Sequence, residues 1–273
     1  MVRRSSAIWV FLLLAWSLGP LLWQLYTSFS SPDALLNSLL KIPGSWTLAN
    51  YRQVLTADPP FWRYLLNSCV VGALSTLLTI TLALPAAYAL TRVRGRLVTL
   101  TRLLLLGAAL FPYVLLFLAL LETARGFYLG NNLLALSLPY AGLSMPLAVL
   151  LLSEAFQDLP VDLEDAARIE GLGLWQRLCW VLLPLIRPAV GSVAILIFIF
   201  AWNEYPIALT WLSQDNLLTL PIAIARIAGS SIYTVPYGAY AASTVLGSIP
   251  LALLVLVFQR QVISGLTGGA VKE

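Results

Sequence analysis

Six long apolar stretches, separated by short polar segments, constrain this chain more than any other feature of its sequence. A helix needs about 20 mostly apolar residues to cross the hydrocarbon of a bilayer, and each stretch has about that length. They lie at about 7–29, 65–91, 103–121, 132–152, 186–208 and 238–258. Hydrophobic residues make up 60% of the chain and charged residues only 10%, which excludes an ordinary soluble surface. The sequence therefore predicts an all-α, polytopic membrane protein with six transmembrane helices in a single domain, residues 1–273.

The first stretch follows Arg3 and Arg4, as the apolar core of a secretory signal would. Its apolar run exceeds the roughly 7–15 residues of such a core, and no small-x-small cleavage site closes it. We therefore expect this stretch to be retained as a signal-anchor helix.

The distribution of Lys and Arg predicts the orientation of the spans. If the N-terminus is cytoplasmic, eleven of the 16 basic residues lie on the inner side and five on the outer side, and short cytoplasmic loops carry such an excess. The inner set is Arg3, Arg4, Arg92, Arg94, Arg96, Arg102, Arg168, Arg177, Arg187, Arg260 and Lys272, and the outer set is Lys41, Arg52, Arg63, Arg125 and Arg226. Both termini are predicted to be cytoplasmic, in a multi-pass protein of the cytoplasmic membrane.

Several classes of function are excluded by missing residues. Without histidine, a His-bearing catalytic triad and most zinc sites cannot form, and Cys69 and Cys179 suggest neither a disulfide framework nor a metal site. No G-x-x-x-x-G-K-[ST] phosphate loop exists, because neither Lys41 nor Lys272 follows such glycines. The basic residues are spread through loops rather than forming a stripe, which argues against nucleic acid. We expect no catalytic residue, no metal and no cofactor bound by this chain.

The segment 154–180 is the longest polar stretch on the predicted cytoplasmic side. Pro160 and Asp162 can start a short helix there, and Gly171 can end it in the left-handed conformation. Two alanines, Ala166 and Ala167, would keep one face of this helix thin enough to lie in a groove of another protein. A solvated helix that merely joins two spans is the alternative, and the physical argument leaves both open.

The spacing in this segment resembles the EAA motif in the cytoplasmic loop of ABC importer permeases. The matching residues are Asp165-Ala166-Ala167, Gly171 and Val181-x-Leu183-Pro184, with Asp165 where the family more often has Glu. Other stretches resemble the maltose- and trehalose-type carbohydrate permeases: Trp46-Thr47-Leu48-x-Asn50-Tyr51, Asn67-Ser68, Ala201-Trp202-Asn203-Glu204, Phe258-Gln259-Arg260 and Gly265 to Lys272. Together these segments cover nearly the whole chain.

This resemblance implies a type I ABC importer permease fold and a set of partners. A second, different permease subunit would complete the pore, two ATP-binding cassette subunits would use ATP and Mg²⁺, and an extracytoplasmic solute-binding protein would deliver a malto-oligosaccharide, trehalose, sucrose or similar glycosyl solute. Membrane lipid would surround the spans. The residues implied in coupling to the ATPase are Glu164, Asp165, Ala166, Ala167, Arg168, Glu170, Gly171 and Pro184, and those of an ATPase-contacting tail are Gly268, Gly269 and Lys272.

A solute pathway is suggested by Trp202, Asn203, Glu204 and Tyr205 near the end of the fifth stretch. Polar groups and flat apolar faces together suit a carbohydrate, and an ionisable residue near a span marks a pathway by default. Alternatively, the two aromatic residues are interface anchors and Glu204 reaches outer water; the sequence does not decide.

Two other classes of function remain as competitors. An ion-coupled secondary transporter would show inverted repeats and buried acids at matching positions, whereas only Glu204 lies near a span. An intramembrane enzyme would need a nucleophile and a base, and no such pair is evident at the centre of a span.

Overall fold

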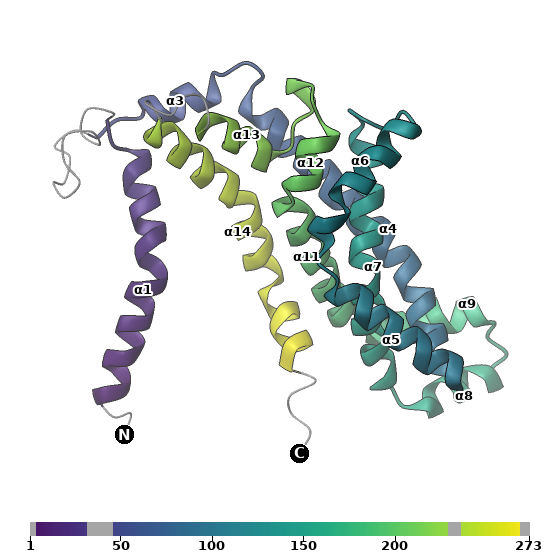
Figure 1. Cartoon of the computed structure of the whole chain (residues 1–273). Helices are drawn as coiled ribbons and strands as arrows, with labels where there is room; N and C mark the ends of the chain where they lie inside the picture. Colours follow the sequence, from purple (N-terminus) through teal and green to yellow (C-terminus); the bar gives the residue numbers. More distant parts are fainter. Residues whose placement is uncertain (1–3, 32–45, 229–235, 268–273) are drawn as a thin grey trace. The chain divides into compact units, whose positions relative to one another are not determined.

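The computed structural model describes residues 4–31, 46–228 and 236–267, and within these ranges the chain is almost entirely helical (Figure 1). The described residues form no β-sheet, and the one isolated bridge joins Ser30 and Trp46. The prediction of an all-α protein is confirmed. The chain divides into two compact units, one made of residues 1–65 and 218–250, the other of 66–217 and 251–273.

Among the described residues, four helices are long and apolar enough to cross a membrane as single elements. Two bent helix pairs bring the number to six if each pair counts as one span. The single helices are α1 (Arg4–Ser28), α4 (Phe61–Arg92), α7 (Leu133–Gln157) and α14 (Tyr237–Thr267). The bent pairs are α5 (Arg96–Leu110) with η1 (Tyr113–Leu116) and α6 (Phe117–Gly126), and α9 (Leu174–Gln176), η2 (Arg177–Leu182) and α10 (Leu183–Leu185) with α11 (Arg187–Asn203).

The expected span 103–121 is not one straight helix. α5 ends at Leu110, and the chain bends by 85° before it continues through η1 and α6. Phe111 has an extended backbone (φ −68°, ψ 132°) because the following Pro112 disfavours the helical conformation at this position. Proline also lacks the N–H that would continue the helix.

The expected span 186–208 is interrupted as well. α11 ends at Asn203, Glu204 is extended, and a short helix α12 (Pro206–Trp211) follows. Pro206 occupies the first position of α12, where its missing N–H removes no helical hydrogen bond. The break leaves Glu204 between two helices.

The first unit contains α1, α3 (Ala49–Leu55), α13 (Leu220–Ala228) and most of α14. Asn50 of α3 donates two hydrogen bonds of 2.9 Å to the carbonyls of Ser28 and Ser30, and so satisfies acceptors at the end of α1. Gly238 of α14 lies against this amide, and a Cβ at that position would approach the Asn50 side chain to 2.4 Å. A glycine is therefore required where α14 begins.

In the second unit, α7 packs against both α5 and α11. Their core is made of apolar residues from α4, α7, η2 and α11, with Ile186 just before α11: Ala83, Ala87, Tyr88, Ala148, Val149, Leu152, Phe156, Leu178, Leu182, Ile186, Val193 and Ile197. Small residues on α4 and α7 let the helix backbones approach closely, as is common between membrane helices.

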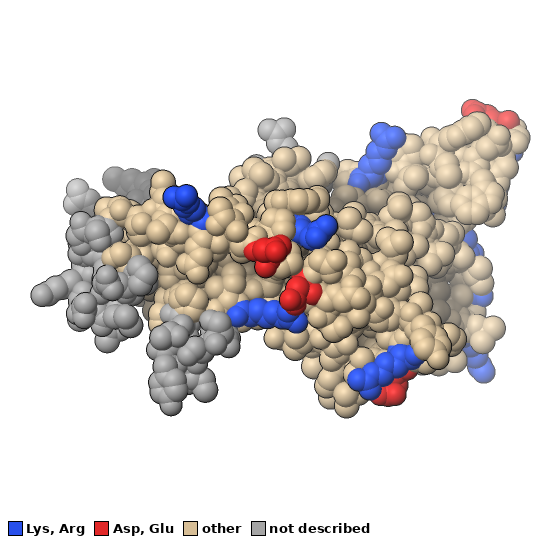
Figure 2. All heavy atoms as spheres, turned by 90° about the horizontal axis from the view of Figure 1, so that it is seen from above, with Lys and Arg blue, Asp and Glu red and all other residues tan. Residues whose placement is uncertain are grey.

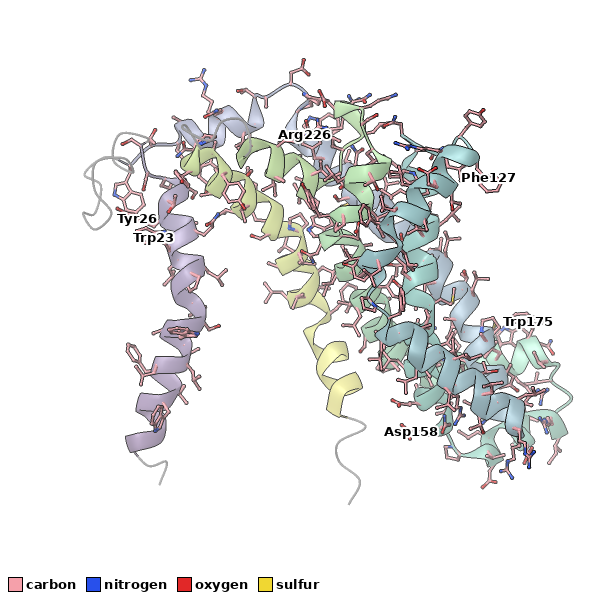
Figure 3. All side chains as sticks on the ribbon, viewed as in Figure 1. Trp23, Tyr26, Phe127, Asp158, Trp175 and Arg226 are labelled. Atoms are coloured by element: carbon pink, nitrogen blue, oxygen red, sulfur yellow. The ribbon has the colours of Figure 1, made fainter. Side chains whose placement is uncertain are left out.

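The two ends of the second unit carry different loops. Phe127, after α6, lies at one end, whereas Asp158 and Trp175 lie at the other (Figure 3). The segments 122–131 and 154–180 thus lie at opposite ends of the spans, as the alternating topology requires. Charged side chains are scattered over a mostly uncharged surface in the view of Figure 2.

Candidate functional site

The polar segment between the fourth and fifth expected spans contains the predicted short helix, α8 (Val161–Ile169). Asp162 and Glu164 lie in its first turn and Arg168 in its last, so both ends carry charges that favour the helix dipole. Pro160 precedes it with an extended backbone. The helix begins and ends where the sequence predicts.

Gly171 ends α8 in the left-handed conformation, with φ 84°. Its amide donates to the carbonyl of Arg168 (3.0 Å), and the amide of Leu172 donates to that of Ala167 (3.1 Å). These two bonds form a Schellman motif, which satisfies carbonyls that the helix leaves open. The conformational role predicted for Gly171 is confirmed.

The outward face of α8 is unusually exposed. Of its nine residues, only Glu164 and Ala167 are buried. Ile169 is 88% exposed and Val161 57%, although α8 is too short and too polar to lie in lipid. Ala166 is exposed while Ala167 is 5% exposed, so the two alanines do not form one thin face. Ala167 is small because it packs against its own chain.

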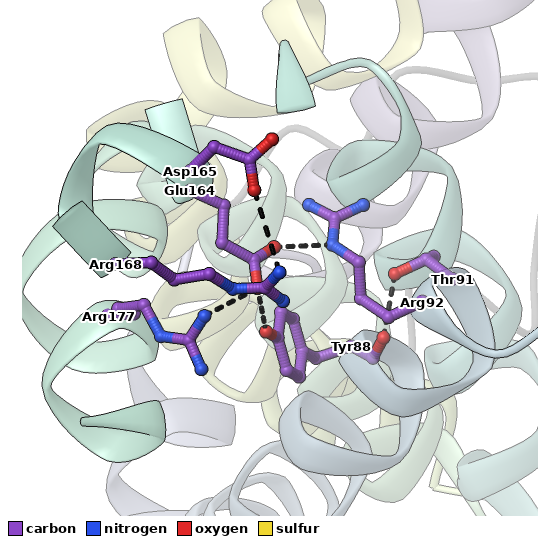
Figure 4. A network of polar contacts seen from close by, with 7 residues as sticks. All are labelled: Tyr88, Thr91, Arg92, Glu164, Asp165, Arg168 and Arg177. Carbon is purple, nitrogen blue, oxygen red and sulfur yellow. Dashed lines mark hydrogen bonds and ion pairs between the residues drawn. The ribbon is translucent and has the colours of Figure 1, made fainter. Parts of the chain in front are cut away.

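Glu164 is the centre of a buried polar network (Figure 4). Its residue is 1% exposed, and its carboxylate accepts hydrogen bonds from four side chains. Arg92 Nε donates at 2.6 Å, Arg168 Nη2 at 3.1 Å and Arg177 Nη1 at 3.3 Å, and the Tyr88 hydroxyl donates as well. Each bond is charge-assisted, which makes it stronger than a bond between neutral groups.

These donors also set the ionisation of Glu164. Burial alone would raise the pKa of its carboxyl, but hydrogen bonds from Tyr88 and Arg92 and the charges of Arg92 and Arg168 outweigh burial. The pKa of Glu164 is therefore lowered from its ordinary value. A buried carboxylate that is kept charged needs all its partners, and removing one partner of such a network costs about 3–5 kcal/mol.

The network joins elements that are distant in the sequence. Tyr88 and Arg92 lie one turn apart at the end of α4, and Arg177 is the first residue of η2. The Tyr88 ring also packs edge-on against Phe156 of α7, with ring centroids 5.7 Å apart. The Glu164 carboxylate therefore joins α8 to α4 and η2, and the Tyr88 ring packs this junction against α7.

The remaining predicted coupling residues lie on the surface. Asp165 is exposed and pairs with Arg168 at 3.5 Å; Glu170 caps the end of α8 and Pro184 follows η2, both exposed. η2 is a π-helix, a widened turn that often occurs at functional sites. The predicted tail residues Gly268, Gly269 and Lys272 lie outside the described residues.

The predicted pathway residues have unequal environments. Trp202 is buried and its ring stacks on that of Phe198 with centroids 5.6 Å apart, whereas Asn203 is exposed and donates to the carbonyl of Ile199 in its own helix. Tyr205 is half-buried. Asn203 is therefore accessible, Tyr205 is partly accessible and Trp202 belongs to the packing.

Glu204 does not reach water. It is 2% exposed, and its carboxylate accepts hydrogen bonds from the amides of Ile207 (2.9 Å) and Ala208 (3.0 Å) and from the hydroxyl of Tyr140 (2.5 Å). It therefore caps α12 and ties the break after α11 to α7. The interpretation of Glu204 as a group in outer water is wrong.

A cavity of about 720 Å³ lies among α5, η1, α7 and α11. Its lining is almost entirely apolar, with Tyr113 and Phe200 in edge-to-face contact at 5.2 Å on one side. Ser144 contributes a hydroxyl with no hydrogen-bond partner among the described residues. Among the described residues, no three His, Cys, Asp or Glu side chains lie close enough together to hold a metal ion.

The partners of the two buried carboxylates were not identified from the sequence. Tyr88 and Arg92 lie one helical turn apart, and a tyrosine and an arginine at that spacing near a span end are a weak signal for an acidic partner. For Tyr140 of α7 the sequence offers no comparable signal. In both cases the acid is more than 60 residues away in the chain.

Comparison with known proteins agrees with this architecture. Residues 73–267 match the family described as "Binding-protein-dependent transport system inner membrane component". The chain is 38% identical to the sulfoquinovosyl glycerol transport system permease protein SmoH of Agrobacterium fabrum, over 96% of this chain and 91% of that protein. It is 36% identical to the trehalose transport system permease protein SugB of Mycobacterium tuberculosis, over the full length of both. It is 37% identical to the trehalose/maltose transport system permease protein MalG of Thermococcus litoralis, over 93% and 91%.

Among solved structures, a chain of a bacterial ABC transporter involved in the import of the acidic polysaccharide alginate has a similar fold. The TM-score is 0.80 at 21% identity, with 95% of this chain and 98% of that chain covered. A chain of the MetNI methionine ABC transporter in an inward-facing conformation gives a TM-score of 0.59 at 18% identity, covering 77% and 99%. The expected importer permease fold is confirmed.

Proposed function

Because this chain belongs to the family of binding-protein-dependent transport system inner membrane components, we propose that it forms one half of the pore of an ATP-driven sugar importer. It is a multi-pass protein of the inner membrane. The chain itself changes conformation during transport, while separate subunits hydrolyse ATP. We propose that ATP and Mg²⁺ are used by those separate subunits.

The observation that carries this proposal is the exposed face of α8. Ile169 and Val161 are exposed on a helix outside the lipid, beside the exposed acid Asp165. A partner that covers Ile169 would gain about 1.5–3 kcal/mol from its burial alone. The partner we propose is the ATP-binding cassette subunit, into whose surface α8 docks as a helix in a groove.

The solute we propose is a sugar or a glycosyl compound. The relatives named above are permeases for sulfoquinovosyl glycerol, trehalose and maltose, and the similarity to each extends over more than nine-tenths of this chain. The cavity beside Tyr113 and Phe200 offers flat apolar faces for a sugar ring, and Asn203 and Tyr205 offer polar groups. Trp202 and Glu204 support this pathway by packing and capping.

The other partners follow from the same proposal. A second, different permease chain completes the pore, and an extracytoplasmic binding protein delivers the solute. Both termini lie in the cytoplasm with α8, and the tail around Gly268, Gly269 and Lys272 contacts the ATPase. The alternative of an ion-coupled secondary transporter has no support, because the relatives named above are permease proteins of transport systems.

The test is co-purification of this chain with the ATPase subunit of the same importer. Ile169→Asp places a charge where the partner's apolar surface lies, so we expect at least a roughly tenfold loss of bound ATPase, which corresponds to about 1.4 kcal/mol. The matched control is Glu122→Lys, an exposed position of α6, which should leave binding unchanged. The residue that follows α6, Phe127, lies at the opposite end of the second unit from Asp158 and Trp175. If the Ile169→Asp chain co-purifies with as much ATPase subunit as the unmodified chain, the proposed docking surface is wrong.

A further inference from the structure

Glu164 differs from its neighbours on α8 because its carboxylate points into the chain. The Glu164 side chain is 2% exposed, whereas that of the next residue, Asp165, is 55% exposed. A partner docked on the outer face of α8 meets Asp165 and Ile169 but does not reach Glu164. The family resemblance implies that Glu164 takes part in coupling, and its burial directs its contacts into the chain.

The Glu164 carboxylate connects α8 to α4, a span that does not adjoin α8 along the chain. Along the chain, α8 lies between α7 and α11. Through space, Glu164 accepts hydrogen bonds from Tyr88 and Arg92 of α4, which are 76 and 72 residues away. Figure 4 shows both side chains converging on the carboxylate from the end of α4. α4 is a helix of 32 residues that continues through Pro85, so unbroken helix joins its Tyr88–Arg92 end to the rest of the span.

This junction resists separation. Moving α8 away from α4 would take the Tyr88 and Arg92 donors from a buried carboxylate and would leave the Arg92 Nε without its acceptor. Removing one partner of a buried charge pair is strongly disfavoured, although Arg168 and Arg177 would still contact the carboxylate. Arg92 also lies over the Tyr88 ring, 5.6 Å from its centroid, so the α4 side of the junction is itself held in place. The two helices therefore move together more readily than they separate.

We propose that Glu164 is a positioning residue that fixes α8 to α4, so that movement imposed on α8 reaches α4 directly and not only through the backbone links to α7 and α11. This inference rests on the proposed docking of the ATPase on α8. It assigns a part in coupling to Tyr88, which lies inside the predicted span 65–91, and to Arg92, which the sequence indicates only as one of the cytoplasmic basic residues.

The test is the number of solute molecules transported per ATP hydrolysed by the complete importer in vesicles. Glu164→Gln keeps the shape of the side chain and removes its charge, and we expect the ATPase to stay bound while this ratio falls about tenfold, within the usual range of coupling between sites. Arg92→Gln should lower the ratio similarly. The double variant should be no worse than either single one, because both remove the same junction.

The control is Leu152→Ala, which opens a cavity in the same core without touching the carboxylate. It should lower the thermal stability of the complex and leave the transport ratio unchanged. If Glu164→Gln does not accumulate in the membrane, Tyr88→Phe decides, since it removes one hydroxyl and should still lower the ratio. The proposal would be overturned if Glu164→Gln, or Tyr88→Phe in its place, transported as much solute per ATP as the unmodified chain. It would also be overturned if Leu152→Ala lowered transport per ATP by the same factor.

The two proposals fail in different ways. If Ile169→Asp leaves the ATPase bound, the docking surface is wrong and α8 does not transmit movement of the ATPase. If Ile169→Asp releases the ATPase but Glu164→Gln transports the normal amount of solute per ATP, α8 is the docking helix and its junction with α4 does not transmit the movement.

Discussion

The carboxylate of Glu204 provides the sharpest test of the packing around the break in the fifth span. Glu204→Leu keeps the approximate size of the side chain and removes every acceptor. The amides of Ile207 and Ala208 and the hydroxyl of Tyr140 then lose their partner in a buried site. Each unsatisfied group costs about 1–3 kcal/mol, and because such losses overlap we expect a total of about 3–5 kcal/mol.

A second substitution separates the contributions. Tyr140→Phe removes one donor to a charged acceptor and should cost about 1.5–3 kcal/mol. Combined with Glu204→Leu, it should add little, because the hydroxyl that the first substitution leaves unpaired is no longer present. The matched control is Asn203→Ala, one residue away but exposed, which should change stability by less than about 0.5 kcal/mol.

Unfolding of the purified chain by denaturing detergent in mixed micelles would measure these differences. The expected order of destabilisation is Glu204→Leu, then Tyr140→Phe, then Asn203→Ala. If Glu204→Leu destabilises no more than Asn203→Ala, the carboxylate does not hold α12 to α7. Additive effects of Glu204→Leu and Tyr140→Phe would show that the two side chains do not interact.

Further variants test the charge and the end of α8, the orientation of the spans and the C-terminal tail. The pKa of Glu164 is lowered from its ordinary value of 4.5, so its charge stabilises the fold fully above that pH and stops doing so as the pH falls through the lower folded-state pKa. The stability advantage over Glu164→Gln, measured by unfolding, should therefore be constant above pH 4.5 and shrink below it; a difference that does not change with pH would contradict this. Gly171→Ala, which meets no steric clash but must adopt φ 84°, should cost about 1–2 kcal/mol and Gly171→Asn less, and equal stabilities would refute the conformational argument. With Cys69 and Cys179 replaced by Ser, Tyr128→Cys should react with an impermeant thiol reagent in intact cells and Glu170→Cys should not; the reverse pattern would invert the topology. Deleting 266–273 should lower transport per ATP without changing membrane insertion, and full coupling without it would show that the tail is dispensable.

The number and place of the spans could be predicted because lipid as a solvent leaves a simple signal. Only runs of about 20 apolar residues fit the hydrocarbon, so composition alone locates α1, α4, α7 and α14. The bends could not be predicted with the same security. Pro112 ends its helix whereas Pro139 and Pro146 lie within α7, and the difference depends on which neighbours accept the displaced backbone groups.

The local structure of the candidate site could be predicted from the sequence, but its contacts between residues far apart in the chain could not. Gly171 marks the end of α8 because only a few residues tolerate its φ, and that constraint is visible in the sequence. The roles of Glu164 and Glu204 depend on Tyr88, Arg92 and Tyr140, which the fold brings from more than 60 residues away. A buried acid and an exposed acid such as Asp165 look alike until those partners are placed.

The central claim is that ATP hydrolysis by partner subunits drives a sugar through a pore of which this chain is one half. Its most direct test is uptake of labelled trehalose and maltose into vesicles that contain this chain, its partner permease and the ATPase, with the binding protein added outside. We expect uptake that requires ATP inside the vesicles and the binding protein outside, and that persists when ionophores collapse all ion gradients. Uptake that an ion gradient drives without ATP would contradict it.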